Sequence, residues 1–454
     1  MARQREMHDP DYRRELDGGL VVRWSTPRDT EPIAELSSFV FRRSADEQPN
    51  RPVEAWIRDV MSGRHPHMDP GSYVVVEEPA TGRIVSASCL LSYEIELDGV
   101  RLPFGRPEIV ATHPAYRNRG LVRALFGLLH ARSAARGHLV QGITGIPYYY
   151  KLFGYEYAAD LGGEVSVPFA AIPPLKEGEP EPYGLRTATE PELSTARELY
   201  DRDRARYALT TPIDEKYWRW VSCGMNRDSG EGWTTRLIVD RGGVIVGYTL
   251  TARSRDADEV GVRALGVRAG TSLAAVVPSV LRACVALANE LLPRRAEPPL
   301  PSRVTLWLWR EHPVYGVLTE AQAARAVHPY AWYLRVAELG PFIMKIRGVL
   351  EGRLAASALA GHTGELRLTF YRGGMRLVFQ DGRLEAVEDW REDHAWGPRA
   401  QAGFPPNVFL RLLFGHRSLS ELREGYPDVN ATDEARPLLE ALFPPRRAWL
   451  LPLD

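Results

Sequence analysis

Cysteine is scarce in this chain. Its 454 residues include three cysteines, Cys89, Cys223 and Cys284, which lie far apart in the sequence. Their number and spacing form neither a disulfide framework nor a set of metal ligands. We therefore predict a reducing, cytoplasmic environment and no metal site.

Long apolar runs and a large net charge are also absent. No stretch approaches the ~18 consecutive apolar residues of a membrane helix. Residues 1–16 are charged and lack the apolar core of a signal peptide. Lysine and arginine number 57 against 58 aspartates and glutamates, a net charge of −1, which favours neither nucleic acid nor an anionic membrane as a partner. These features predict a soluble, cytoplasmic protein. The length predicts two or three domains.

The stretch of residues 106–157 combines several chemically informative features. The apolar run 109–111 has the length of a buried strand, and a polar, basic loop follows it and ends at Gly120. From Leu121 the apolar residues recur with helical spacing. The next apolar run, residues 139–143, predicts a second strand, and a short aromatic helix follows.

The start of that helix predicts an anion site. The first backbone N–H groups of a helix have no internal partner, and the helix dipole places partial positive charge there. Gly120 lets a phosphate approach the backbone, and Arg117 and Arg119 add positive charge. The loop is neither a Walker sequence nor G-x-G-x-x-G. The alternative is a basic helix cap on a solvated face.

Two motifs in this stretch resemble those of a known family. The loop Arg117-Asn118-Arg119-Gly120-Leu121-Val122 resembles motif A of the GNAT superfamily of N-acetyltransferases, R/Q-x-x-G-x-G/A, with valine at the last position. Residues 150–155, YKLFGY, resemble the Tyr-x-x-Leu/Phe-Gly-Phe/Tyr signature that follows the next strand in that family. Val122 is typical of the Eis-like (enhanced intracellular survival) branch. The layout of nearly the whole chain resembles that branch.

The resemblance implies a site for acetyl-CoA as co-substrate. The backbone at the end of the first strand would polarise the thioester and hold the pantetheine arm, and the loop would bind the pyrophosphate. The residues implied are Val110, Ala111 and Thr112 for the strand, and Arg117, Asn118, Arg119, Gly120, Leu121 and Val122 for the loop.

The resemblance also implies the proton-transfer groups. Tyr150 matches the position of the general acid, and a phenol with a pKa near ~10 is protonated at neutral pH. The alternative is that Tyr150 is a packing aromatic. The α-carboxylate of Asp454, which follows the apolar residues 449–453, matches the position of the base. A tail that only packs is the alternative, with Glu108 acting as base through water.

The predicted fold class is α+β. Tandem GNAT domains, each a mixed central sheet flanked by helices, precede a sterol-carrier-protein-like α+β domain. The predicted segments are a catalytic domain (1–170), a proline-rich linker (171–182), a degenerate second GNAT-like domain (183–336) and the sterol-carrier-like domain (337–454). Strands at 164–169 and 330–336 are expected to close the first and second domains.

Two local features carry further expectations. In the second domain the loop 266–271 lacks the order of motif A, and Pro278 predicts a helix that bends or restarts. His65 and His67, alternate residues in a Pro/Gly stretch without a third ligand nearby, are predicted to lie in a surface loop rather than at a metal.

Three functions remain open from the sequence. The first is acetyl transfer to a primary amine of a small molecule, aminoglycoside-like or polyamine-like. The second is acyl transfer to a protein lysine or from a longer acyl-CoA. The third is a non-catalytic scaffold that binds CoA or lipid. The resemblance further implies a homo-hexamer.

Overall fold

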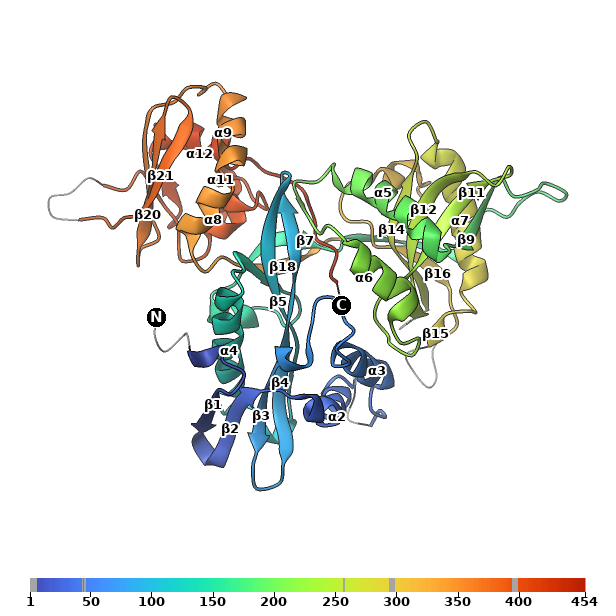
Figure 1. Cartoon of the computed structure of the whole chain (residues 1–454). Coiled ribbons are helices and arrows are strands. Elements are labelled where there is room, and N and C mark those ends of the chain that lie inside the picture. The colour runs from blue at the N-terminus through green and yellow to red at the C-terminus, as the bar shows by residue number, and fades with distance from the viewer. Residues whose placement is uncertain are drawn as a thin grey trace.

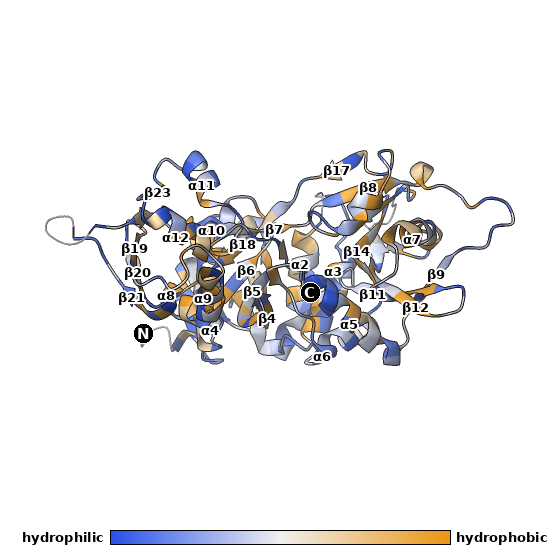
Figure 2. Ribbon diagram, turned by 90° about the horizontal axis from the view of Figure 1, so that it is seen from above, coloured by the Kyte–Doolittle hydropathy of each residue, from blue (hydrophilic) through white to orange (hydrophobic). Residues whose placement is uncertain are grey.

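The computed structural model describes residues 6–42, 44, 46–255, 258–293, 299–393 and 399–453. Three sheet-based domains lie side by side, with the first in the middle (Figures 1 and 2). A separate two-stranded sheet joins β13 (Ser254–Arg255) and β15 (Leu292–Pro293). Within the described ranges, no helix is long and apolar enough to cross a membrane.

The first sheet has helices on both faces. Its order is β1 (Arg13–Leu16), β2 (Leu20–Trp24), β3 (Tyr73–Glu78), β4 (Arg83–Leu97), β5 (Val100–Thr112), β6 (Val140–Ile143), β18 (Tyr330–Arg335) and β7 (Glu156–Leu161). Helix α4 (Leu121–Ala135) packs on one face, and α2 (Thr30–Val40) and α3 (Arg51–Val60) pack on the other (Figure 1). The consecutive valines of β3 are therefore all buried: Val75 packs under α2 and α3, whereas Val74 and Val76 pack under α4.

The second sheet repeats the same order. From one edge it runs β9 (Tyr183–Thr187), β11 (Trp233–Asp240), β12 (Ile245–Ala252), β14 (Glu259–Val267), β16 (Arg303–Leu306), β8 (Glu164–Pro168) and β17 (Arg325–Val327). Helices α5 (Leu193–Arg204), α6 (Glu215–Arg219) and α7 (Leu273–Leu287) belong to this domain. Strands β5 and β6, like β14 and β16, are parallel central neighbours. The order confirms the predicted tandem repeat.

Two strands lie in a different sheet from the one expected. The strand predicted at 164–169 to close the first domain forms β8, which pairs with β16 and β17 in the second sheet. The strand predicted at 330–336 to close the second domain forms β18, which pairs with β6 and β7 in the first. Each occupies the equivalent position of the other's sheet, so the two domains are tied together by an exchange of strands.

The helix that contains Pro278 does not restart at that residue, which was one of the two expected outcomes. Helix α7 runs without interruption from Leu273 to Leu287, with Pro278 inside it. Proline removes one hydrogen-bond donor, but the helix is held by its buried face, which contributes Val276, Val277 and Leu281 to the second core.

The third domain has a smaller sheet. Its order is β21 (Arg383–Asp389), β20 (Gly374–Gln380), β19 (Gly364–Thr369), β22 (Ala402–Gly403) and β23 (Asn430–Ala431). Its helices are α8 (Leu339–Lys345), α9 (Arg347–Ala355), α10 (Phe409–Leu413), α11 (Leu419–Gly425) and α12 (Ala435–Leu442).

The C-terminal tail returns from the third domain to the first. Strand β24 (Ala448–Trp449) pairs in parallel with β10 (Leu209–Thr210), which in turn pairs with β4. The tail then passes between the first and second domains (Figure 1). The indole N–H of Trp332 donates to the Leu450 carbonyl at 3.1 Å, and Leu451 and Leu453 are buried. The tail is therefore part of the core, as its apolar sequence indicates.

Candidate active site

A bulge interrupts strand β5 at the centre of the first sheet. Cys89 of β4 faces Glu108, and Ala87 faces Ala111, so one residue of β4 lies opposite two residues of β5. One of these, Ile109, has a φ of +49°. That conformation is strained for a β-branched side chain, and such strain gathers at ligand sites. The bulge locally disrupts the strand ladder at the position predicted to meet the thioester.

The first sheet opens next to this bulge. Strands β5 and β6 pair only at Phe104–Val140 and Gly105–Gln141, whereas β5 continues to Thr112 and β6 to Ile143. The two strands diverge beyond Gly105, which leaves an opening between their carboxyl ends. In open α/β sheets, ligands bind outside the carboxyl ends of parallel strands.

Helix α4 begins beside this opening. Asn118 and Gly120 have φ values of +63° and +72°, and no side chain caps the helix. Within the described ranges, no acceptor meets the N–H groups of residues 118–123. A Cβ added at Gly120 would meet nothing within 4 Å. Unpaired N–H groups in such a turn form an anion-binding nest, reinforced by the helix dipole.

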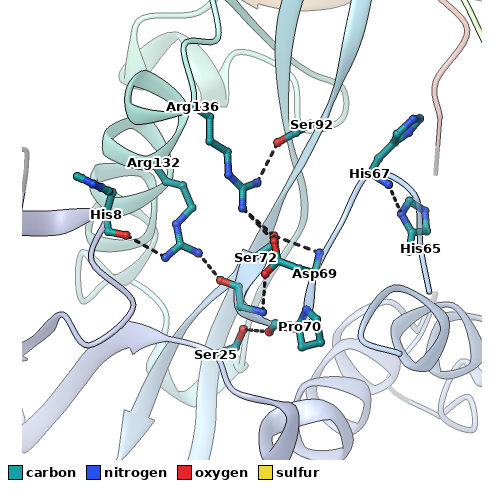
Figure 3. Close-up of polar contacts among 11 residues, drawn as sticks. His8, Ser25, His65, His67, Asp69, Pro70, Ser72, Ser92, Arg132 and Arg136 are labelled. Atoms are coloured by element: carbon teal, nitrogen blue, oxygen red, sulfur yellow. Dashed lines mark hydrogen bonds and ion pairs between the residues drawn. The ribbon is translucent and has the colours of Figure 1, made fainter. Parts of the chain in front are cut away.

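The other end of α4 is tied to the loop before β3 (Figure 3). Arg132 donates to the carbonyls of Gly71 and His8, and its guanidinium lies over the Trp24 ring. Arg136 donates to Asp69 Oδ2 at 3.0 Å and to Ser92 Oγ at 2.9 Å. These contacts hold the axis of α4, and with it the orientation of the free N–H groups.

The opening leads into a cleft of about 510 Å³. Most of the predicted acetyl-CoA residues line it: Val110, Thr112, Arg117, Asn118, Gly120, Leu121 and Val122. Two do not. Ala111 is fully buried and its carbonyl accepts from Ser86 Oγ, and Arg119 folds back over the Tyr116 ring, 4.9 Å from its centre.

The short helix η5 (Tyr149–Phe153) forms the opposite wall of the cleft, to which it contributes Tyr149 and Phe153. Tyr150 lies behind this wall, 3% exposed, with its ring against Phe126 and Tyr333. Burial, and next the charge of Glu108, raise the pKa of Tyr150 well above its usual value. The phenol is thus protonated at neutral pH, as a proton donor must be.

The C-terminal tail ends against strand β5. Arg106 donates to the Leu453 carbonyl at 2.8 Å and forms an ion pair with Glu108 Oε2 at 2.7 Å. These contacts place the last described residue of the tail beside Glu108 and the bulge. Asp454, the predicted base, lies outside the described residues.

A second, smaller pocket of about 240 Å³ also adjoins the bulge. Glu108 and Ile109 line it, together with Trp56 of α3, Pro452 of the tail and residues of the second domain. The first cleft contains Val110 and Thr112. Two cavities therefore meet at the bulge, one lined by Ile109 and the other by its neighbour Val110. No sequence signal singled out Trp56 or Pro452.

The equivalent loop of the second domain has a different geometry. Ser272 caps α7, and its hydroxyl accepts from the N–H of Ala275 at 3.4 Å. The N–H of Thr271 donates to the carbonyl of Arg268 at 3.0 Å. Strands β14 and β16 pair over four positions, Glu259–Val262 with Arg303–Leu306. The start of this helix is thus satisfied by the chain itself, unlike that of α4.

The surface-loop prediction for His65 and His67 was wrong. The two residues are 5% and 8% exposed, because the second domain covers their loop. His67 stacks on Tyr217 at 4.8 Å, and its Nε2 forms a hydrogen bond with Asp214 Oδ2 at 3.1 Å. Within the described ranges, no group of three or more His, Cys, Asp or Glu could hold a metal ion.

Comparison with known proteins identifies the fold. Residues 21–158 match the model of the acetyltransferase (GNAT) domain family. A GCN5-related N-acetyltransferase from Anabaena variabilis is 16% identical, with 95% of this chain and 99% of that chain covered and a TM-score of 0.65. Eis1 from Mycobacterium abscessus is 15% identical, with 93% and 97% covered and a TM-score of 0.56.

A more distant likeness involves a larger acyl group. Yeast (Saccharomyces cerevisiae) N-myristoyltransferase with bound myristoyl-CoA is 12% identical, with 72% of this chain and 86% of that chain covered and a TM-score of 0.52. None of the curated proteins matches the chain. Residues 21–158 thus match a GNAT acetyltransferase domain, and the chain as a whole has the fold of these structures.

Proposed function

We propose that this chain is an acetyl-CoA-dependent N-acetyltransferase that acetylates a primary amine of a small molecule. The observation that carries the proposal is the juxtaposition of three features. The unpaired N–H groups at residues 118–123, the opening between β5 and β6, and the bulge at Ile109 adjoin one cleft. They supply, in order, a site for pyrophosphate, a path for pantetheine and a position for the thioester.

The reaction would be a direct transfer. The amine nitrogen attacks the thioester carbonyl, the C–N bond forms, and the C–S bond breaks. Tyr150 would donate its proton to the leaving thiolate; the match of residues 150–155 to the family signature supports this role, and the raised pKa keeps the phenol protonated at neutral pH. The proton lost by the amine would go to the C-terminal carboxylate of Asp454 or, through water, to Glu108. The buried tail and its contact with Arg106 support either base.

The first candidate substrates are aminoglycoside-like or polyamine-like amines. The likeness to an N-myristoyltransferase supports a second candidate, in which a longer acyl-CoA is the donor. A sterol-carrier-like architecture for the third domain and assembly into a hexamer complete the proposal, and both rest on the Eis-like resemblance. A cytoplasmic location is also proposed, and it rests on the few, widely spaced cysteines.

Thiol release from acetyl-CoA in the presence of a panel of amines tests the function. Wild-type protein should release CoA only when an acceptor amine is present. The Tyr150→Phe variant should lose roughly 10²- to 10⁴-fold in kcat, as is usual for a general acid, with little change in acetyl-CoA affinity.

The neighbouring Tyr149→Phe variant is the matched control, because Tyr149 lines the cleft but does not match the acid position. It should retain nearly full turnover. Full turnover in Tyr150→Phe would remove Tyr150 from the mechanism, whereas no CoA release with any amine would overturn the proposed activity.

A further inference from the structure

The second domain contributes a cation to the pocket of about 240 Å³ beside the bulge. Arg263 of β14 lines this pocket together with the first-domain residues Arg106 and Glu108. Pro452 of the tail completes the junction. The pocket is therefore built jointly by both domains and the C-terminal tail.

Arg263 and Arg106 occupy equivalent positions in the two repeats. Arg106 follows Gly105, the last residue of β5 that pairs with β6. Arg263 follows Val262, the last residue of β14 that pairs with β16. Each arginine thus lies at the point where the central parallel strands of its sheet part. The loop of the second domain has lost the features of a phosphate site, but its central strand still places a guanidinium at this point.

The two arginines differ in their partners. Arg106 is buried and bonded to Glu108 and to the Leu453 carbonyl. Arg263 is half-buried, lies over the Trp307 ring at 5.6 Å, and makes no hydrogen bond or ion pair with any described residue. Its Nε atom is inaccessible to water and unsatisfied. A half-buried guanidinium without a carboxylate partner favours binding of a planar anion that accepts two parallel hydrogen bonds.

We propose that Arg263 binds the carboxylate of the acceptor, so that the acceptor is an amino acid. This inference rests on the proposed transferase function and narrows its substrate class. Glu108 and Glu231 line the same pocket and provide carboxylates for the ammonium group. A volume of about 240 Å³ lies below the roughly 300–1,000 Å³ that drug-sized ligands occupy, which suits an amino acid better than an oligosaccharide.

Paired acceptors test the proposal. Each of several α-amino acids, such as glycine and lysine, is compared with its carboxamide, which keeps the amines and lacks the carboxylate. Wild-type kcat/KM should favour the acid over the amide by about 10- to 100-fold, the usual effect of hydrogen bonds to a charged group. Arg263→Met should abolish this preference by raising KM for the acids, with the amides little affected.

Arg268→Met, on the exposed loop after the same strand, is the control and should keep the wild-type ratio. A wild-type enzyme that prefers the amides, or an unchanged ratio in Arg263→Met, would overturn the proposal even if turnover is normal. Calorimetric titration with the same amino acids, without acetyl-CoA, separates the two proposals. If binding is lost in Arg263→Met while no amine is acetylated, the amino acid site stands and the transferase function fails.

Discussion

A negative charge at the start of α4 should weaken acetyl-CoA binding, whereas the same change in the second repeat should not. Gly120 and Gly270 occupy corresponding loops, have φ values of +72° and +83°, and have no atom within 4 Å of an added Cβ. Gly120→Asp and Gly270→Asp therefore carry a similar, modest strain, and aspartate tolerates this backbone region better than most residues. Their melting temperatures should fall by similar small amounts.

The size of the binding defect follows from Coulomb's law. A carboxylate about 4 Å from a phosphate charge is repelled by about 1 kcal/mol in water and by about 4 kcal/mol at a surface-protein dielectric constant near 20. The loop is exposed on one side and backed by the cleft, so the expected loss lies within that range, about 5- to 1,000-fold in Kd.

Isothermal titration of each variant with acetyl-CoA measures the defect. Raising the salt concentration should reduce the difference between Gly120→Asp and wild type, since exposed charges are screened. Wild-type affinity in Gly120→Asp, or an equal loss in Gly270→Asp, would refute the assignment of the α4 start as the phosphate site.

Two other predictions concern the tail and the second domain. Removing the last two residues takes away the buried Leu453 side chain and the carbonyl that Arg106 contacts. The truncation should lower the free energy of unfolding by about 2–3 kcal/mol and slow turnover. An unchanged melting temperature together with unchanged turnover would exclude a role for the tail. Burial raises the pKa of Asp203 to about 6, although its ion pair with Arg206 opposes the shift. The folded protein therefore binds the Asp203 proton more tightly than the unfolded chain does, which stabilises the fold by about 3 kcal/mol at most below the unfolded pKa near ~4. This stabilisation is lost as the pH rises to about 6. Asp203→Asn should thus gain stability relative to wild type between pH 4 and pH 6.5 in calorimetric melting. A difference in melting temperature between the two proteins that stays constant over this pH range would contradict the raised pKa of Asp203.

The geometry of the proposed phosphate site could be predicted from sequence because it is local. A basic loop, Gly120 and the helical spacing from Leu121 lie within a few residues of each other, and the N–H groups of a helix start need no distant partner to form an anion site. The strand before the loop could also be predicted from its apolar residues. Its bulge could not, because the φ of Ile109 depends on pairing with β4.

Contacts between distant segments could not be predicted in this way. Arg106 meets a carbonyl 347 residues further along the chain, and no pattern around either residue indicates the other. His65 and His67 lie in a sequence typical of an exposed loop, but the second domain covers them. Strands β8 and β18 each have a sequence compatible with either sheet, and only the docking of the two repeats decides which they join.

Hydrogen exchange of the intact protein, with and without acetyl-CoA, tests the central claim most directly. The free N–H groups of residues 118–123 and the backbone beyond the bulge should exchange more slowly when the ligand is bound. The corresponding peptide of the second repeat, residues 266–273, should show no change. Slower exchange at 266–273, or unchanged exchange at 109–123 under conditions where acetyl-CoA binds, would contradict the location of the site.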